Sequence, residues 1–163
     1  MIVLSLDQAL KICGYSVYDS STDKLIDYGC KDFKEIAYNG DIEFTMIRIV
    51  EIKEWFKELV VKYKPEIFII EDTQKQINPN VFKKLSCLMG SLGSYLEEMK
   101  YPYFICHCTQ WKSFLGIKGK KSVDQKANAK QYIKDRFYID VQQDTVDAIC
   151  IGLWGANEIK KHI

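Results

Sequence analysis

The sequence has no apolar stretch long enough to span a membrane, little proline or glycine, and almost no net charge. It contains 3 Pro and 9 Gly in 163 residues, with a formal net charge of +1. A membrane helix needs about 20 apolar residues, and residues 1–6 are too short and unbasic for a signal peptide. The composition, 47% hydrophobic and 28% charged, excludes disordered, collagen-like and repeat architectures. We expect a soluble, unsecreted, cytoplasmic protein with one domain over residues 1–163.

The six cysteines are scattered through apolar segments, which predicts reduced core residues and no disulfide framework. Only Cys106-His107-Cys108 hints at a metal site. The alternation of this segment fits a strand, and no second ligand pair with zinc spacing is present. An ordinary strand is therefore favoured there over a zinc site.

The hydrophobic pattern predicts an α/β fold with a mixed five-stranded sheet and element order βββαβαβαα. The first three strands form an antiparallel meander, and the apolar, β-branched fourth strand is typical of one covered on both faces. The predicted strands are 2–7, 14–19, 25–33, 66–71 and 103–108. The predicted helices are 43–62, one that starts at 78–80 and carries an apolar stripe to Leu96, 123–137 and 143–159.

Charge is unevenly distributed along the chain. Residues 110–136 contain seven Lys and one Arg against two Asp, so a near-neutral total conceals a basic tract. Such a tract suits the binding of phosphate groups. A solvated helix face explains the same charges, and charge alone does not decide between the two.

Four carboxylates occupy positions that are unusual for surface acids. Asp7 and Glu71 each close an apolar strand, whereas Asp144 and Asp147 are three residues apart at the front of the last helix. Residues spaced i and i+3 share a helix face, and catalytic groups of open α/β sheets gather at the carboxyl ends of strands. Several buried acids are costly without a cation. The hard oxygen ligands suit Mg²⁺ or Mn²⁺.

Each acid also has a purely structural interpretation. Asp144 can cap the helix N-terminus, where a negative charge is favourable, and Asp147 can lie at the surface. Glu71 can be an ordinary strand-end acid, and Asp72 beside it competes for the inward position.

Three segments, LSLDQALKICGYSV, FIIEDTQ and DTVDAICIGL, resemble in order and spacing the acidic blocks of the RuvC family of Holliday junction resolvases. The resemblance extends from Val3 to about Trp154 and implies a ribonuclease H-like fold. Asp7 then matches the family's first-strand Asp, Glu71 its fourth-strand Glu, and Asp144 and Asp147 its final acid pair. All four would be both metal ligands and catalytic residues.

The chemistry implied by this resemblance is phosphodiester hydrolysis with two Mg²⁺ ions, for which Mn²⁺ would substitute. The products would carry 5′-phosphate and 3′-hydroxyl ends. Lys112 resembles the family's basic residue before its glycine loop, and Lys126 resembles a lysine that holds phosphate near the scissile bond. The remaining predicted DNA-binding residues, in what looks like a short insertion, are Lys118, Lys120 and Lys121.

The sequence departs from the family at two places. Gln8-Ala9 stand where the family has Pro-Gly, and Gln74 stands where bacterial members have an aromatic residue. Base stacking contributes about 1–3 kcal/mol, so the second change bears on junction distortion and cleavage-site preference more than on metal chemistry. These departures resemble the phage-encoded branch, whose members are often less selective among branched DNAs. The protein would then lie in the cytoplasm of a bacterial host.

The predicted function is therefore a metal-dependent endonuclease that nicks four-way junctions and other branched DNA, such as replication forks and flaps. Paired nicks on opposed strands require two sites, which favours a homodimer. The candidate interface is the surface of residues 81–96 with Gly90 and Gly93, for which core packing within the monomer is the alternative. Two other functions stay open: a nuclease of the same fold that acts on RNA or RNA–DNA hybrid, and a non-catalytic binder of branched nucleic acid.

Overall fold

A computed structural model describes residues 1–36, 41–74 and 78–162. Its mixed five-stranded sheet has the order β3-β2-β1-β4-β5. β1 pairs antiparallel with β2 and β2 with β3, whereas β4 runs parallel to β1 and β5 parallel to β4. The strands are β1 (Ile2–Asp7), β2 (Ile12–Asp19), β3 (Lys24–Asp32), β4 (Ile67–Glu71) and β5 (Tyr103–Cys106). The predicted α/β fold, with its opening meander and mixed sheet, is confirmed.

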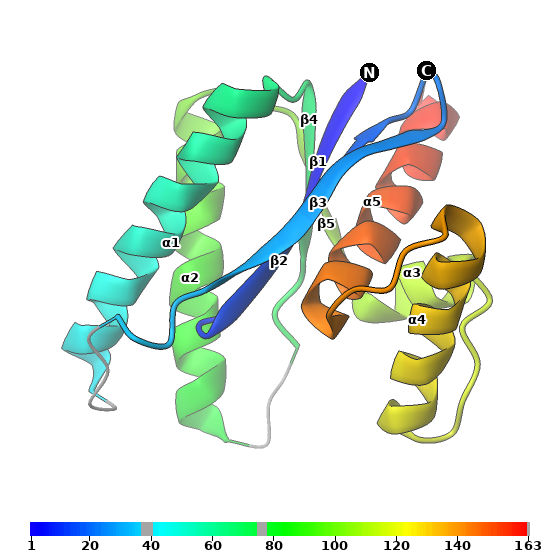
Figure 1. Cartoon of the computed structure of the whole chain (residues 1–163). Coiled ribbons are helices and arrows are strands. Elements are labelled where there is room, and N and C mark those ends of the chain that lie inside the picture. Colours follow the sequence, from blue (N-terminus) through cyan, green and yellow to red (C-terminus); the bar gives the residue numbers. More distant parts are fainter. Residues whose placement is uncertain (37–40, 75–77, 163) are drawn as a thin grey trace.

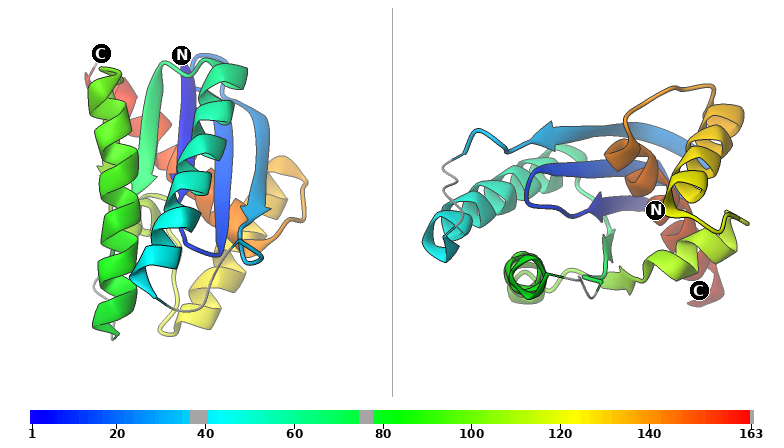
Figure 2. Two further views of the ribbon diagram at one scale, coloured as in Figure 1. Left: turned by 90° about the vertical axis from the view of Figure 1, so that its left-hand side faces the viewer. Right: turned by 90° about the horizontal axis from the view of Figure 1, so that it is seen from below.

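The helices form layers on both sides of this sheet (Figure 1). α1 and α2 lie side by side on one face, which the left view of Figure 2 shows toward the viewer. α5 covers the other face, and α3 and α4 pack against α5. In the part of the chain that the structure describes, no helix could cross a membrane. The helices are α1 (Ile42–Tyr63), α2 (Pro79–Glu98), α3 (Cys108–Phe114), α4 (Ser122–Phe137) and α5 (Gln143–His162).

The short helix α3 is an addition to the predicted elements, and it shortens the fifth strand. The strand was expected to extend to residue 108 but ends at Cys106. The Gln110 side chain accepts a hydrogen bond from the His107 backbone N–H at 2.7 Å, so the chain turns into a helix there. Side-chain acceptance at a helix start satisfies a donor that otherwise has no partner.

The alternation of side chains along the strands divides the core in two. Leu4 and Leu6 of β1 belong to the cluster under α1 and α2, together with Phe68 and Ile70 of β4. Val3 belongs to the cluster under α5. Because side chains alternate along a strand, Asp7 and Glu71 lie on the face of the sheet that α5 covers.

The two faces contact their helices differently, although both carry a hydrophobic core. Under α1 and α2, large rings meet edge to face, as in the Phe56–Phe68 pair with centroids 5.7 Å apart. Under α5 the sheet presents Gly14, Ser5 and Ser16. Ser5 Oγ lies 2.6 Å from Ser16 Oγ and donates to the Ala148 carbonyl at 2.7 Å. Small residues therefore allow the α5 backbone to approach the sheet closely.

Candidate active site

Asp7 and Glu71 end two neighbouring parallel strands. Leu6 of β1 is in register with Ile70 of β4, so the next residue of each strand is one of the two acids. Both side chains emerge on the α5 face by the alternation described above. The end of a parallel strand pair is thus where two acids from distant parts of the sequence meet.

Gly14 brings the start of α5 to this same end of the sheet. Gly14 is in register with Asp7 across the β1–β2 pair. A Cβ atom at Gly14 would lie 1.9 Å from the Asp144 carbonyl oxygen, so only glycine leaves room for the α5 backbone. Further along, a Cβ atom at Gly155 would lie 2.3 Å from Ile69 Cγ1. The close contact of α5 therefore places Asp144 over the end of β1.

The four acids interact electrostatically. Burial raises the pKa of Asp7 well above its ordinary value, and the charges of Glu71, Asp147 and Asp144 raise it further, whereas Lys126 lowers it. Solvent still reaches part of Asp7, so this burial reflects the dense protein around its carboxyl group. The structure thus brings together all four acids predicted from the sequence.

Glu71 and Asp147 are each held by a neutral donor. Burial raises the pKa of Glu71, and a hydrogen bond from Trp111 partly opposes this rise. Trp111 Nε1 donates to Glu71 Oε1 at 2.8 Å. Burial likewise raises the pKa of Asp147, and a hydrogen bond from Gln143 is the main influence that lowers it. Gln143 Nε2 donates to Asp147 Oδ1 at 2.7 Å. The sequence did not reveal either donor. For Trp111, its position beside Lys112 was the available signal.

Asp72 has a different partner from Glu71. One Asp72 carboxylate oxygen lies 3.1 Å from His107 Nε2, and Asp72 N–H donates to the Cys106 carbonyl. Its charge acts on Glu71 but is not a main influence on Asp7 or Asp147. Glu71 is thus the acid of this pair that joins the others.

All six cysteines are free.

The five predicted DNA-binding lysines divide into two groups. Lys126 lowers the pKa of Asp7 and Asp147, and Lys112 lowers the pKa of Glu71 and Asp147, so both lie within electrostatic reach of the acids. Lys118, Lys120 and Lys121 are exposed in the segment before α4 and are not among the main charges on the acids. The structure therefore connects two of the five lysines to the site.

The four acids offer the oxygen ligands that a divalent cation prefers. Among the described residues, no three His, Cys, Asp or Glu side chains converge closely enough to form a ready metal centre. The acids are electrostatic neighbours and not a closed coordination sphere. Two observations nevertheless match a cation. Burial, and then the neighbouring acids, raise the pKa values of Asp7, Glu71 and Asp147 despite the lysines nearby, and the buried Gln8 Oε1 has no described donor. Mg²⁺ keeps several waters and needs only one or two carboxylates, so the residues fit a hydrated ion.

No family model matches the sequence, and no curated protein sequence matches it. Solved structures do match. RuvC of Thermus thermophilus, in complex with a Holliday junction substrate, has a TM-score of 0.78 at 15% identity, covering 99% of this chain and 96% of its own. Fowlpox virus resolvase, solved with Holliday junction DNA, has a TM-score of 0.63 at 16% identity and coverages of 98% and 99%. The yeast mitochondrial Holliday junction resolvase has a TM-score of 0.63 at 17% identity, with coverages of 98% and 80%.

The chain has the RuvC fold. The ribonuclease H-like architecture expected from the three acidic segments is thereby confirmed, because similar structures extend over nearly the whole chain. Because the sequence identity is only 15–17%, this structural similarity establishes the fold and nothing further. Which residues act, and on what, rests on the site itself.

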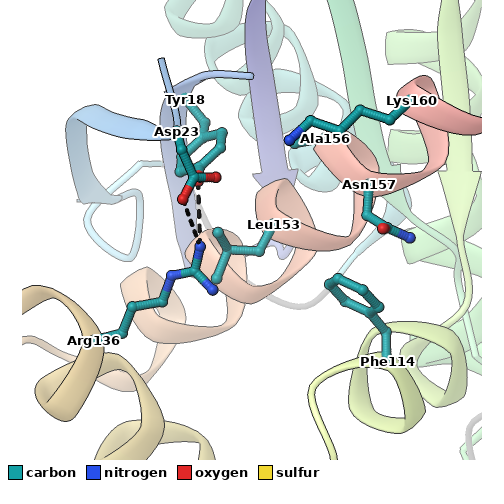
Figure 3. Close-up of a pocket in the computed structure, with 8 residues that line it drawn as sticks. All are labelled: Tyr18, Asp23, Phe114, Arg136, Leu153, Ala156, Asn157 and Lys160. Atoms are coloured by element: carbon teal, nitrogen blue, oxygen red, sulfur yellow. Dashed lines mark hydrogen bonds and ion pairs between the residues drawn. The ribbon is translucent and has the colours of Figure 1, made fainter. Parts of the chain in front are cut away.

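A separate cavity of about 110 Å³ lies near the opposite end of β2 in this RuvC fold (Figure 3). Arg136 enters it from the end of α4, and its Nη2 lies 3.3 Å from Asp23 Oδ2 and 3.4 Å from Tyr18 Oη. Lys160 also lines it. Because Arg136 already pairs with Asp23, its charge ties α4 to the β2–β3 turn. We assign this cavity a structural role.

Proposed function

We propose that this protein is a metal-dependent endonuclease that nicks Holliday junctions and other branched DNA. The observation that carries the proposal is the meeting of Asp7, Glu71, Asp144 and Asp147 at one end of the sheet, where burial and mutual repulsion raise the pKa of Asp7. Acids in this state favour a cation. The RuvC fold supports the choice of substrate, since two proteins of this fold were solved with Holliday junction DNA.

Asp7, Glu71, Asp144 and Asp147 would hold two Mg²⁺ ions, with Mn²⁺ as a substitute. When bound, such ions lower the pKa of an attacking water and stabilise the leaving oxygen, which yields 5′-phosphate and 3′-hydroxyl ends. Trp111 engages Oε1 of Glu71 and Gln143 engages Oδ1 of Asp147. Each bond orients its carboxylate while the second oxygen stays available for a cation.

Lys112 and Lys126 would neutralise the phosphate that is cut. Both already act on the acids, so they lie close enough to reach a phosphodiester bound there. Lys118, Lys120 and Lys121 are exposed further along the same basic tract. We assign them to the DNA backbone away from the scissile bond, where such contacts give affinity without sequence preference.

A homodimer through the α1–α2 layer completes the proposal. Val81 and Phe82 at the start of α2 are each 40% exposed. Cβ atoms at Gly90 and Gly93 would meet nothing within 4 Å, so these glycines do not serve close packing within the monomer. Exposed apolar side chains on two neighbouring helices favour an interaction surface when they gather into one patch. The exposed apolar residues of α1 are Phe44, Met46, Ile47, Val50 and Val61.

The decisive experiment compares an end-labelled four-way junction with linear duplex and RNA–DNA hybrid, each with Mg²⁺ or EDTA. We expect symmetry-related paired nicks in the junction only, and only with Mg²⁺. Cutting of the hybrid while the junction survives would assign the protein to RNA. Binding without cutting under Mg²⁺ or Mn²⁺ would leave a non-catalytic binder.

The same assay assigns the acids. Glu71→Gln and Asp147→Asn should each reduce nicking by more than about 100-fold, the loss typical of removing one charge-stabilising group. Junction binding should change little, because the lysines supply the phosphate contacts. Glu58→Gln is the matched control, since Glu58 is exposed on α1. Loss of binding as severe as the loss of nicking would refute this division of roles.

A further inference from the structure

A polar cavity of about 160 Å³ lies beside Glu71, between the end of the sheet and α2. It is distinct from the cavity at Arg136, and one of the four proposed catalytic acids, Glu71, lines it. Its volume is sufficient for several water molecules. The residues that line it are Gln8, Glu71, Asp72, Thr73, Gln74 and Leu85.

Gln8 contributes an unusual atom to this part of the site. Its Nε2 donates to the Glu71 backbone carbonyl at 2.9 Å. Because a carbonyl only accepts hydrogen bonds, this contact fixes which end of the amide is oxygen. Gln8 Oε1 is buried, and no described residue donates to it. A buried acceptor without a partner is unfavourable, so this oxygen calls for a donor.

The other polar groups of the cavity already have partners. Asp72 pairs with His107 at 3.1 Å. Thr73 Oγ1 donates to Met89 Sδ at 3.5 Å. Burial raises the pKa of the Cys108 thiol, and a hydrogen bond with the Gln74 side chain partly opposes this rise. Among the described residues, the buried side-chain acceptor of this cavity that has no partner is Gln8 Oε1, and the acids Glu71 and Asp72 line the same cavity. A wall of acceptors beside acids attracts a hydrated cation and repels phosphate.

We propose that Gln8 is a positioning residue for the divalent cation. Its Oε1 accepts a hydrogen bond from a water molecule on the ion held by Glu71, while its Nε2 fixes the end of β4. The inference rests on the proposed metal-dependent function. It also gives a role to the position where this chain departs from the Pro-Gly of the RuvC family. Partners in this outer shell typically affect metal affinity by about 10–100-fold.

The test measures Mg²⁺ binding without DNA, as the Mg²⁺ concentration that gives half of the maximal rise in melting temperature. Gln8→Met keeps the length of the side chain and removes both polar atoms. We expect it to raise this concentration about ten-fold. Thr73→Val is the matched control on the same cavity wall, because the Thr73 hydroxyl is already bonded; we expect a change of less than about two-fold.

A second variant separates the acceptor from the bond to β4. Gln8→Glu keeps an oxygen at the same place but loses the donor to the Glu71 carbonyl. Under our proposal it binds Mg²⁺ at least as tightly as the wild type; weakening equal to that of Gln8→Met would instead assign Gln8 to the β4 contact alone. An unchanged Mg²⁺ midpoint in Gln8→Met would overturn the proposal and leave the metal site intact. If the melting temperature of the wild type does not respond to Mg²⁺, the proposed metal site itself is refuted. If Gln8→Met does not fold in EDTA, Gln8→Ser replaces it.

Discussion

The two faces of the sheet hold their helices in different ways. Under α1 and α2 the core consists of large side chains, such as Trp55, Phe56 and Leu92. Under α5 the sheet presents Gly14, Ser5 and Ser16, and the helix backbone comes close enough for the Ala148 carbonyl to accept from a strand serine. Both faces have a hydrophobic core, but only under α5 do small residues of the sheet also let the helix backbone contact the strands.

This difference separates stability from positioning. A core of large side chains contributes mainly stability and tolerates substitutions that keep its volume and pattern. A backbone contact over glycine fixes one helix position within narrow limits. α5 carries Asp144 and Asp147, so the face where the helix backbone lies against Gly14 is the one that sets the geometry of the proposed chemistry.

The largest expected effect is on stability and concerns the face under α1 and α2. Leu92→Ala removes a fully buried side chain of α2, and such changes lower the free energy of unfolding by about 3 kcal/mol. Urea unfolding measures it. The nicking rate per folded molecule should equal that of the wild type. A slower rate in fully folded protein would break the separation of the two faces.

Gly14→Ala tests the other face. The added Cβ would lie 1.9 Å from the Asp144 carbonyl oxygen, so the start of α5 has to move from the sheet and carry the acid pair with it. Misplacement of reacting groups by about 1 Å can lower a rate by about 100-fold, which we expect for nicking under saturating Mg²⁺. Full activity in folded Gly14→Ala would show that close approach does not position the acids.

The pH dependence of stability should also differ between acids in the site and acids outside it. A carboxyl group whose pKa is raised by folding stabilises the protein below its unfolded pKa, and this contribution is lost as pH rises through the folded pKa. Without Mg²⁺, the free energy of unfolding should therefore fall from about pH 4 toward neutral pH. Asp7→Asn should flatten this fall and raise the free energy of unfolding at neutral pH.

The control for this experiment has the opposite sign. Hydrogen bonds from Thr22 and Ser21 lower the pKa of Asp19 to about 2, so its contribution is present above the unfolded pKa and is lost in acid. Asp19→Asn should therefore destabilise the protein at neutral pH. Thermal unfolding in EDTA from pH 4 to pH 8 measures both variants. Asp7→Asn less stable than wild type at neutral pH would contradict the raised pKa.

The sequence was sufficient to predict the strands and the main helices, because hydrophobic period is a local signal. The structure also brings the four predicted acids into electrostatic contact, while their role stays a prediction. The sequence did not predict α3, since the turn at His107 depends on one hydrogen bond that the His107 N–H donates to the Gln110 side chain. Nor did it reveal Gly14, Trp111 and Gln8 as parts of the site. Their roles follow from contacts with residues 40 or more positions away, which no local pattern encodes. The lysines between β5 and α5 were the least determined, as their loop contains an apparent insertion.

The smallest expected effect separates these lysines. Lys126→Ala should weaken nicking about five-fold and reduce the salt slope of junction binding by about 1. Because Lys126 lowers the pKa of Asp7 and Asp147, its removal raises those pKa values further, and the loss of nicking should be greater at pH 6 than at pH 8. Lys120→Ala, in the exposed segment before α4, should weaken binding without this pH dependence. Identical pH profiles for the two variants would show that Lys126 acts on DNA alone and not on the acids.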